Sequence, residues 1–537
     1  MKASDTIIKC LLNENVDTVF GYPGGHILEV YEALRKSKIH HVLVRQEQAA
    51  AHSASGYARI TGKVGVCIAT SGPGATNLIT GIATAYMDSI PLAIITGQVN
   101  SSKIGRDMFQ EADITGATES FTKHSYLVKN EKDLPRIIKE AFYIASTGRP
   151  GPVLIDIPSD IQAAKVEKPI IPESVDIRGY KPTTKGHVGQ IKRAIKSISE
   201  STRPLIIAGG GFILSNAKSE LLNFVEKTGI PLVHTLMGKG SLPSSNSHYF
   251  GMIGNHGFSE ANRAVAKADL LIIIGARVAD RTWGRIADKI HEGMRLIHID
   301  VDPAEIGKNV GIQIPLVGDA KTILAQMVEK AEKVNTDEWL NELRSYKGAN
   351  KSSETGLVDP KYAIETISRK LNDQAIMVAD VGQNQIWAAR YFEDRIGRNF
   401  LTSGGLGTMG YGLPAAVGAK MAAPKRQVVA VVGDGGFQMS LHELGTISYN
   451  NLGIIILLFN NSRLGMVREL QDKAFGKINA VELDRNPDFI KLCDAYGIKG
   501  VRITNNSELD DAFDKAIRHK GPFVVECVVD PNESTLL

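Results

Sequence analysis

The sequence predicts an α/β protein made of three doubly wound parallel-sheet domains. Short runs of aliphatic and β-branched residues alternate with stretches of helical character, which is the pattern of buried parallel strands joined by helices. Two polar stretches, Lys165–Gly186 and Thr336–Asp359, interrupt this alternation and are typical of linkers. The length of 537 residues suits several folding units, because a domain usually holds about 150 residues. The predicted strands are His41–Val44, Val64–Ala69, Leu92–Thr96, Val153–Ile157, Leu205–Ala208, Leu270–Ile274, Leu296–Ile299, Ile376–Val378, Val428–Val432 and Ile454–Phe459.

The two predicted linkers divide the chain into residues 1–170, 186–335 and 358–537. The first part contains the first four predicted strands, and the other two parts contain three each. We therefore expect each part to form a sheet of its own.

Composition excludes several classes of protein. The formal charge of +4 is small for this length, and the basic residues are dispersed among 58 acidic ones, so nucleic acid is not an expected partner. The four cysteines are far apart and form no CxxC pair, which argues against a disulfide framework or a zinc site. No signal-type apolar core follows the amino terminus, and no apolar run approaches the roughly 18 residues that span a bilayer. We expect a cytoplasmic protein without a membrane segment.

Two groups of polar residues directly follow predicted strands of the third part. Gly433–Gly436 (Gly-Asp-Gly-Gly) comes after Val428–Val432, and Asn460–Asn461 comes after Ile454–Phe459. Open parallel sheets bind ligands at the carboxyl ends of their strands. Carboxylate and amide oxygens suit magnesium, and the N–H groups of a glycine turn suit phosphate. A plain tight turn and an ordinary strand end are the alternatives for the two groups taken singly.

The spacing of the two groups points to a family. Between Gly435 and Asn460 lie 24 residues, and this arrangement resembles the metal motif of thiamine-diphosphate-dependent enzymes. The resemblance implies that thiamine diphosphate and Mg²⁺ bind here. It implies as metal ligands the side chains of Asp434 and Asn461 and the backbone carbonyl of Arg463.

Glu47 is the candidate for the group that activates the cofactor. It follows the predicted strand His41–Val44 and begins a helix rich in small residues. A glutamate at a helix start is otherwise a favourable partner of the helix dipole. Its segment resembles the family's Arg-His-Glu-Gln, although Gln46 stands where histidine is usual. The resemblance implies that Glu47 hydrogen-bonds N1′ of the aminopyrimidine.

Further segments extend the resemblance. Phe20–Gly25, Ala69–Asn77 and Gly404–Gly412 resemble segments of the same family, and Met108–Asp113 and Thr122–Tyr126 resemble acetolactate synthases in particular. The resemblance implies that Met409 lies under the cofactor and that Gln110 lies near the reacting carbons. Taken alone, Met409 would be core filler and Gln110 a solvated loop residue. The implied thiamine diphosphate contacts are Val381, Gly382, Gln383, Asn384, Gly407, Met409, Gly433, Gly435 and Gly436.

The middle part resembles the flavin-binding domain of the same enzymes. Its glycine-rich turns follow predicted strands but contain no G-x-G-x-x-G, so plain βα turns are the alternative. The resemblance implies a structural FAD. The implied contacts are Arg149, Gly209, Gly210, Gly211, Thr235, Leu236 and Arg277. The three parts are then a thiamine pyrimidine-binding domain (1–170), a central domain of FAD-binding type (186–335) and a diphosphate- and Mg²⁺-binding domain (358–537).

Substrate contacts are also implied by the resemblance. Arg281 matches the residue that holds the acceptor's carboxylate, a task for a planar charged fork, whereas a surface ion pair with Asp280 is the alternative. His26 and Asn255 depart from the usual pattern, and Leu470 replaces a tryptophan that favours 2-oxobutyrate. The implied substrate-binding residues are Gly25, His26, Phe109, Arg281, Met466 and Leu470.

The predicted activity is the decarboxylating condensation of pyruvate with a second 2-oxo acid, pyruvate or 2-oxobutyrate, in branched-chain amino acid biosynthesis. The family implies a homodimer or homotetramer with active sites at the subunit interface, and a possible small regulatory subunit. Another thiamine-dependent carboligase or lyase and a catabolic acetolactate synthase are the alternatives. A non-catalytic nucleotide-binding subunit would not need Glu47 together with Asp434 and Asn461.

Overall fold

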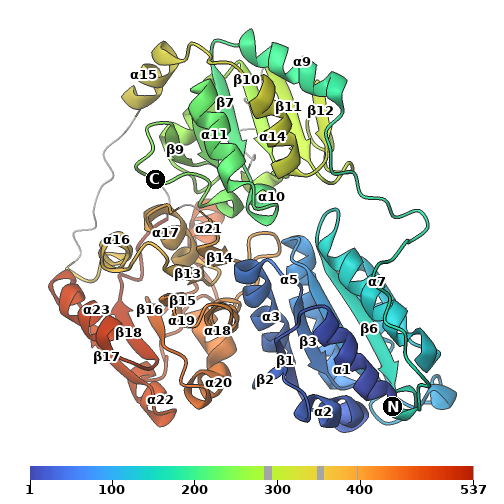
Figure 1. Cartoon of the computed structure of the whole chain (residues 1–537). Coiled ribbons are helices and arrows are strands. Elements are labelled where there is room, and N and C mark those ends of the chain that lie inside the picture. The colour runs from blue at the N-terminus through green and yellow to red at the C-terminus, as the bar shows by residue number, and fades with distance from the viewer. Residues whose placement is uncertain (283–292, 347–355, 396, 536–537) are drawn as a thin grey trace.

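The computed structural model describes residues 1–282, 293–346, 356–395 and 397–535. Its strands form three six-stranded sheets, and every pairing within them is parallel (Figure 1). The predicted fold class is therefore confirmed. No helix among the described residues is long and apolar enough to cross a membrane.

The first sheet has the strand order β2-β1-β3-β4-β6-β5. Its strands are β1 (Thr18–Tyr22), β2 (His40–Leu43), β3 (Gly65–Ala69), β4 (Leu92–Gln98), β5 (His124–Leu127) and β6 (Pro152–Pro158). Its helices are α1 (Ala3–Asn13), α2 (Leu28–Arg35), α3 (Glu47–Thr61), α4 (Pro73–Thr76), α5 (Ile79–Met87), α6 (Ile114–Thr118), α7 (Leu134–Ser146) and α8 (Ser159–Ala163).

The middle sheet has the order β12-β11-β10-β7-β8-β9. Counted from β9, this is the order 3-2-1-4-5-6 of dinucleotide-binding folds, with the switch point between β7 and β10. Its strands are β7 (Pro204–Ala208), β8 (Leu232–His234), β9 (Tyr249–Met252), β10 (Leu270–Ile274), β11 (Arg295–Asp300) and β12 (Ile314–Val317). The helices are α9 (Val188–Ser199), α10 (Gly210–Leu214), α11 (Lys218–Thr228), α12 (Ser259–Lys267), α14 (Ala320–Lys330) and α15 (Asp337–Ser345).

The third sheet has the order β14-β13-β15-β16-β18-β17. Its strands are β13 (Ile376–Ala379), β14 (Phe400–Thr402), β15 (Val428–Gly433), β16 (Ile454–Asn460), β17 (Lys499–Ile503) and β18 (Phe523–Val528). The helices are α16 (Pro360–Lys370), α17 (Gln383–Tyr391), α18 (Gly412–Ala422), α19 (Asp434–Ser440), α20 (Leu444–Tyr449), α21 (Gly465–Phe475), α22 (Phe489–Ala495) and α23 (Leu509–Arg518).

All ten predicted strands are present, with bounds shifted by at most two residues. The strands that the sequence did not predict include several short ones at sheet edges, such as β5 and β14, whose apolar runs are too brief to stand out. The first predicted linker, Lys165–Gly186, contains neither helix nor strand apart from a single bridge between Lys165 and Lys2.

The prediction that Thr336–Asp359 is a linker is wrong for the first third of this segment. There α15 forms a helix whose Trp339, Leu340 and Leu343 are buried in the core of the middle domain. The Trp339 indole also donates to the carbonyl of Pro204 across 3.0 Å. The segment looked polar because its three buried side chains are outnumbered by charged residues on the opposite helix face. Residues 347–355 of this linker lie outside the described residues.

The first and third domains share one hydrophobic core along α3 and α18, which lie side by side in Figure 1. The two helices approach so closely that only glycine fits at the contact. A methyl group on Gly418 would lie 1.8 Å from the Ser53 carbonyl oxygen, and one on Gly56 would lie 2.1 Å from that of Ala415. This contact fixes the two domains relative to each other.

Candidate active site

The two predicted metal-binding side chains follow neighbouring strands. Asp434 begins α19 directly after β15, and Asn461 comes directly after β16. The two strands pair in parallel up to Gly433 and Phe459, so their carboxyl ends lie together at one edge of the sheet. This register agrees with the sequence prediction that the two groups lie close together.

Asp434 lies in a buried position that suits a cation. Its Oδ1 accepts from the Gly435 N–H at 3.0 Å and its Oδ2 from the Asn486 amide at 2.8 Å. Burial raises the pKa of Asp434 to about 6, because the charged form loses its solvent. A divalent cation beside the carboxylate would favour the charged form again.

Asn461 and Arg463 are held by a short turn. The Asn461 Oδ1 accepts from the Arg463 N–H at 3.1 Å, and its amide nitrogen donates to the Gln383 Oε1 at 2.9 Å. The neighbours of Arg463 in the chain make backbone bonds to Val481 and Leu483, which fix the turn. One carboxylate, one amide and one carbonyl form a hard-oxygen donor set that fits Mg²⁺ completed by phosphate and water. Among the described residues no group of three or more His, Cys, Asp or Glu could hold a metal, and this donor set does not require one.

The predicted diphosphate turn follows β13. Both N–H groups of the Asn384 amide donate to backbone carbonyls, those of Asp380 at 2.9 Å and Val431 at 3.1 Å. Its Oδ1 lies 2.9 Å from where a methyl group on Gly382 would stand and 3.3 Å from one on Gly433. Asn384 therefore connects the end of β13 to β15 and has no amide donor left for phosphate.

Met409 lies beside the glycine turn of the metal site. Its Cε is 3.5 Å from the place where a methyl group on Gly435 would stand. Behind Met409, the buried Asp380 carboxylate accepts from the backbone N–H groups of Val381, Gly410 and Gly412 at 2.7 to 3.0 Å. Burial raises the pKa of Asp380 to about 6. These contacts bring Met409 and the diphosphate turn into one cluster.

Glu47 and the predicted donor-side residues gather on the first domain. The Glu47 Oε2 accepts from the Asn77 amide at 2.9 Å, and its Oε1 lies 3.3 Å from a methyl group placed on Gly74. A methyl group on Gly74 would also touch Thr70, whose hydroxyl accepts from the His26 N–H at 3.2 Å. These residues all surround the segment Thr70–Gly74.

The loop Phe109–Gln110 lies against the same segment. The His26 ring Nε2 is 3.3 Å from the carbonyl oxygen of Phe109. Gln110 has a φ of +60° and packs on Gly72, where a methyl group would lie 2.8 Å from the Gln110 Cβ. Predicted residues from three distant segments therefore meet here. A methyl group on Gly25 would have no neighbouring atom within 4 Å.

No hydrogen bond or ion pair among the described residues joins Glu47 to the Asp434 cluster. The Glu47 side chain hydrogen-bonds to Asn77 of its own domain, and the Asp434 side chain hydrogen-bonds to Asn486 of the third domain.

The predicted substrate-binding residues Met466 and Leu470 lie on α21, and the Leu470 side chain is 59% exposed.

Arg281 reaches the Met409 cluster from the middle domain. Its guanidinium donates to the carbonyl of Gly404 and to the Gln385 Oε1, each at 3.3 Å. The Asp280 carboxylate instead accepts from the backbone N–H of Arg281. The surface ion pair with Asp280 that the sequence left open is therefore not formed.

A cavity of about 510 Å³ lies at the switch point of the middle sheet. Six of the seven predicted flavin contacts line it: Arg149, Gly210, Gly211, Thr235, Leu236 and Arg277. Gly209 packs instead against β10, since a methyl group there would lie 2.3 Å from the Gly275 carbonyl oxygen. Arg149 bridges the domains through Asp302 and Glu305 at 3.2 and 2.9 Å. The cavity is lined by glycines and lies at a sheet that has the strand order of dinucleotide-binding folds. Both features fit a dinucleotide.

Two residues of the site carried no signal in the sequence. Asn486 joins Asp434 to Asn460, although it lies in a loop with no motif around it. Asp88 holds the loop before Met409 from another domain. Both act through contacts between distant segments, which local patterns do not reveal.

Comparison with known proteins identifies the family of this chain. Residues 1–117, 191–327 and 380–527 match the N-terminal TPP-binding, central and C-terminal TPP-binding domains of thiamine pyrophosphate enzymes. A probable acetolactate synthase large subunit of Methanocaldococcus jannaschii is 46% identical over 99% of this chain and 93% of its own length. The isozyme 3 large subunit of Escherichia coli K12 is 42% identical over 99% of this chain and 96% of its own. The chain is thus a thiamine-diphosphate-dependent enzyme and belongs to the family of acetolactate synthase large subunits.

Proposed function

We propose that this chain catalyses the decarboxylating condensation of pyruvate with a second 2-oxo acid, to give a 2-acetohydroxy acid. One observation carries the proposal: the buried Asp434 and Asn461 lie at neighbouring strand ends, with Met409 beside the glycine turn between them. This arrangement supplies oxygen ligands on one side and an apolar support on the other. The relatives named above accord with it.

Mg²⁺ and thiamine diphosphate are the proposed occupants of this cluster. Asp434, Asn461 and the carbonyl of Arg463 would hold the cation, which would offset the negative charge of the diphosphate. Bound thiamine diphosphate supplies a cationic ring that accepts the electrons released when carbon dioxide leaves. The chain's own task is to place that ring, and the polarizable Met409 side chain suits a contact with its face.

Glu47 would hold a proton at N1′ of the aminopyrimidine. Its rigid position at the start of α3, fixed by Asn77, suits a group that must keep one hydrogen bond in place. His26, Phe109 and Gln110 stand next to it around Thr70–Gly74 and would face the donor substrate. Arg281 would bind the carboxylate of the acceptor by a paired hydrogen bond.

A homodimer or larger homo-oligomer is part of the proposal, with Glu47 of one chain serving the Asp434 cluster of a second chain. Within one chain, among the described residues, Glu47 makes no hydrogen bond or ion pair with that cluster. Relatives named as large subunits also suggest a small regulatory partner. FAD with a structural role completes the proposal, in the cavity described above, which residues of all three domains line. The free, buried cysteines accord with a reducing, cytoplasmic location.

The test is an assay of the purified chain with pyruvate, thiamine diphosphate and Mg²⁺. Acetolactate should form, and its formation should stop when the metal is removed by a chelator and resume when Mg²⁺ is restored. Consumption of pyruvate with release of free acetaldehyde as the main product would show a decarboxylase instead. Sedimentation of the active species distinguishes a monomer from the proposed oligomer.

A further inference from the structure

The loop that carries Met409 lies where the three domains meet. We call residues Ser403–Met409 the Met409 loop. A methyl group on Gly404 would lie 2.2 Å from the Met237 sulfur of the middle domain, and one on Gly405 would lie 2.9 Å from the Met87 carbonyl oxygen of the first domain. A side chain on Gly405 would meet backbone and one on Gly404 would have to displace Met237, so the loop packs closely against both neighbouring domains.

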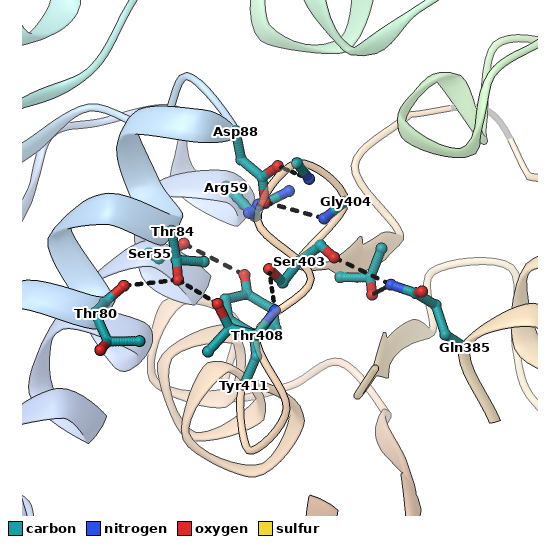
Figure 2. A network of polar contacts seen from close by, with 12 residues as sticks. Ser55, Arg59, Thr80, Thr84, Asp88, Gln385, Ser403, Gly404, Thr408 and Tyr411 are labelled. Carbon is teal, nitrogen blue, oxygen red and sulfur yellow. Dashed lines mark hydrogen bonds and ion pairs between the residues drawn. The ribbon is translucent and has the colours of Figure 1, made fainter. Parts of the chain in front are cut away.

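The buried carboxylate of Asp88 holds the beginning of this loop (Figure 2). Its Oδ1 accepts from the Gly405 N–H at 2.7 Å, and its Oδ2 accepts from Gly404 at 3.3 Å and from the Arg59 guanidinium at 2.6 Å. The side chain of Asp88 is 0% exposed and that of Arg59 is 9% exposed. Hydrogen bonds to a charged acceptor are among the stronger ones, so this contact constrains the loop's backbone.

A second contact from the first domain holds the end of the loop. The Thr84 hydroxyl donates its one proton to the carbonyl of Thr80 at 2.8 Å. The Thr408 hydroxyl must therefore be the donor across the 2.7 Å between Thr84 and Thr408 (Figure 2). Thr408 precedes Met409 directly, so this bond fixes the loop one residue before the side chain that faces Gly435.

The third and middle domains contribute further contacts of the loop. The Arg281 guanidinium of the middle domain donates to the carbonyl of Gly404 at 3.3 Å. The Thr408 N–H donates to the Ser403 hydroxyl at 3.0 Å, which closes the loop on itself. The Gln385 amide donates to the carbonyl of Ser403 at 3.1 Å. The loop thus has internal support and outer contacts from all three domains, and the first domain holds both of its ends through Asp88 and Thr84.

We propose that Asp88 and Thr84 are positioning residues for the reaction, and that they set the place of Met409 by holding the Met409 loop from the first domain. The inference rests on the proposed function, in which Met409 supports the cofactor. Neither side chain contacts Met409 itself, so both act through the loop's backbone and Thr408. The first domain would then contribute to the diphosphate half of the site within its own chain.

Thr84→Val and Thr84→Ser form a matched pair that tests the contact at Thr408. Valine has the shape of threonine without the hydroxyl, whereas serine keeps the hydroxyl. We expect Thr84→Val to raise hydrogen–deuterium exchange in the peptide of residues 402–411 and to lower kcat, each by about 10-fold, the value of one lost hydrogen bond. The KM for pyruvate and the thermal midpoint should stay close to those of the unchanged protein, and Thr84→Ser should restore exchange and kcat.

Asp88→Asn tests the stronger contact, since it removes the charge that Gly404, Gly405 and Arg59 share. We expect a larger rise in exchange at the same peptide and a larger loss of kcat. If this variant fails to fold, because Arg59 is left buried without its partner, the Thr84 pair decides alone.

Unchanged exchange of residues 402–411 and unchanged kcat in Thr84→Val would overturn the inference. A lower thermal midpoint with normal kcat would also overturn it, because it would show that the contact only joins two domains. If the unchanged protein forms no acetolactate, the proposed function fails, whereas the exchange measurement still tests whether the first domain holds the loop.

Discussion

The first and third domains have the same strand order but contribute different chemistry. Each strand of β2-β1-β3-β4-β6-β5 has its counterpart in β14-β13-β15-β16-β18-β17. The turn after β15 presents Asp434, the proposed metal ligand, whereas the turn after its counterpart β3 presents Thr70–Gly74, which packs on Glu47 and Gln110. One fold therefore provides two unlike halves of the proposed site. The residues of the loops, and not the sheet, determine which half each domain provides.

The same correspondence holds for the elements after β2 and β14. Glu47 follows β2 and begins α3, while the Met409 loop follows β14 and leads into α18. These two counterpart helices pack on each other across Gly56 and Gly418. The two domains thus meet through equivalent helices. This contact keeps the helix that begins at Glu47 against the third domain, and the helix that follows the Met409 loop against the first domain.

Glu47→Gln is the variant that best distinguishes the proposed roles of the first and third domains. If the first domain supplies the acid–base group, turnover should fall by about 100-fold or more, the scale of a lost acid–base group. Thiamine diphosphate affinity, measured by calorimetry, should stay nearly unchanged because its anchors lie on the third domain. Glu32→Gln, at an exposed glutamate of the same domain, is the control. Normal turnover of Glu47→Gln would remove Glu47 from the mechanism.

Asp434→Ala should produce the opposite result. Loss of the only charged ligand should weaken thiamine diphosphate binding by about 10- to 100-fold even at high Mg²⁺, because the diphosphate is held through the cation. The exposed Asp373→Ala variant serves as control. Calorimetry that finds the affinity of Asp434→Ala equal to that of the control would mean that Gly-Asp-Gly is only a turn.

Gly418→Ala tests the contact between the counterpart helices. The added methyl group would collide with the Ser53 carbonyl, so the helices must move apart, at a cost of about 1–3 kcal/mol in the free energy of unfolding. Gly311→Ala adds a methyl group where nothing lies within 4 Å and is the matched control. A thermal midpoint equal to that of Gly311→Ala would show that the contact between α3 and α18 is looser than described.

Leu470→Trp should have the smallest effect, since it alters acceptor choice and leaves both halves intact. An acceptor that is larger by one methylene gains from contact with a large aromatic ring, and leucine offers less surface. With pyruvate and 2-oxobutyrate together, the unchanged protein should form mainly acetolactate, and Leu470→Trp should raise the share of acetohydroxybutyrate by about 10-fold. A strong preference for 2-oxobutyrate in the unchanged protein would show that Leu470 does not set acceptor choice.

Much of this molecule could be predicted from the sequence. The continuous apolar runs marked ten strands because a strand buried on both faces needs apolar residues throughout. The order of strand, turn and strand around Asp434 and Asn461 predicted their meeting, since the ends of adjacent parallel strands share one edge. Glu47 and the Met409 loop were found from their resemblance to a family.

Only the tertiary structure decided the contacts between distant segments. α15 was hidden within a polar stretch because its buried face shows only against the middle domain's core. Asn486 near Asp434 and Asp88 at the Met409 loop have ordinary neighbours in sequence, and their partners lie 52 and more than 300 residues away. A local pattern records which face of a segment is apolar, but it carries no record of which distant backbone that segment will meet.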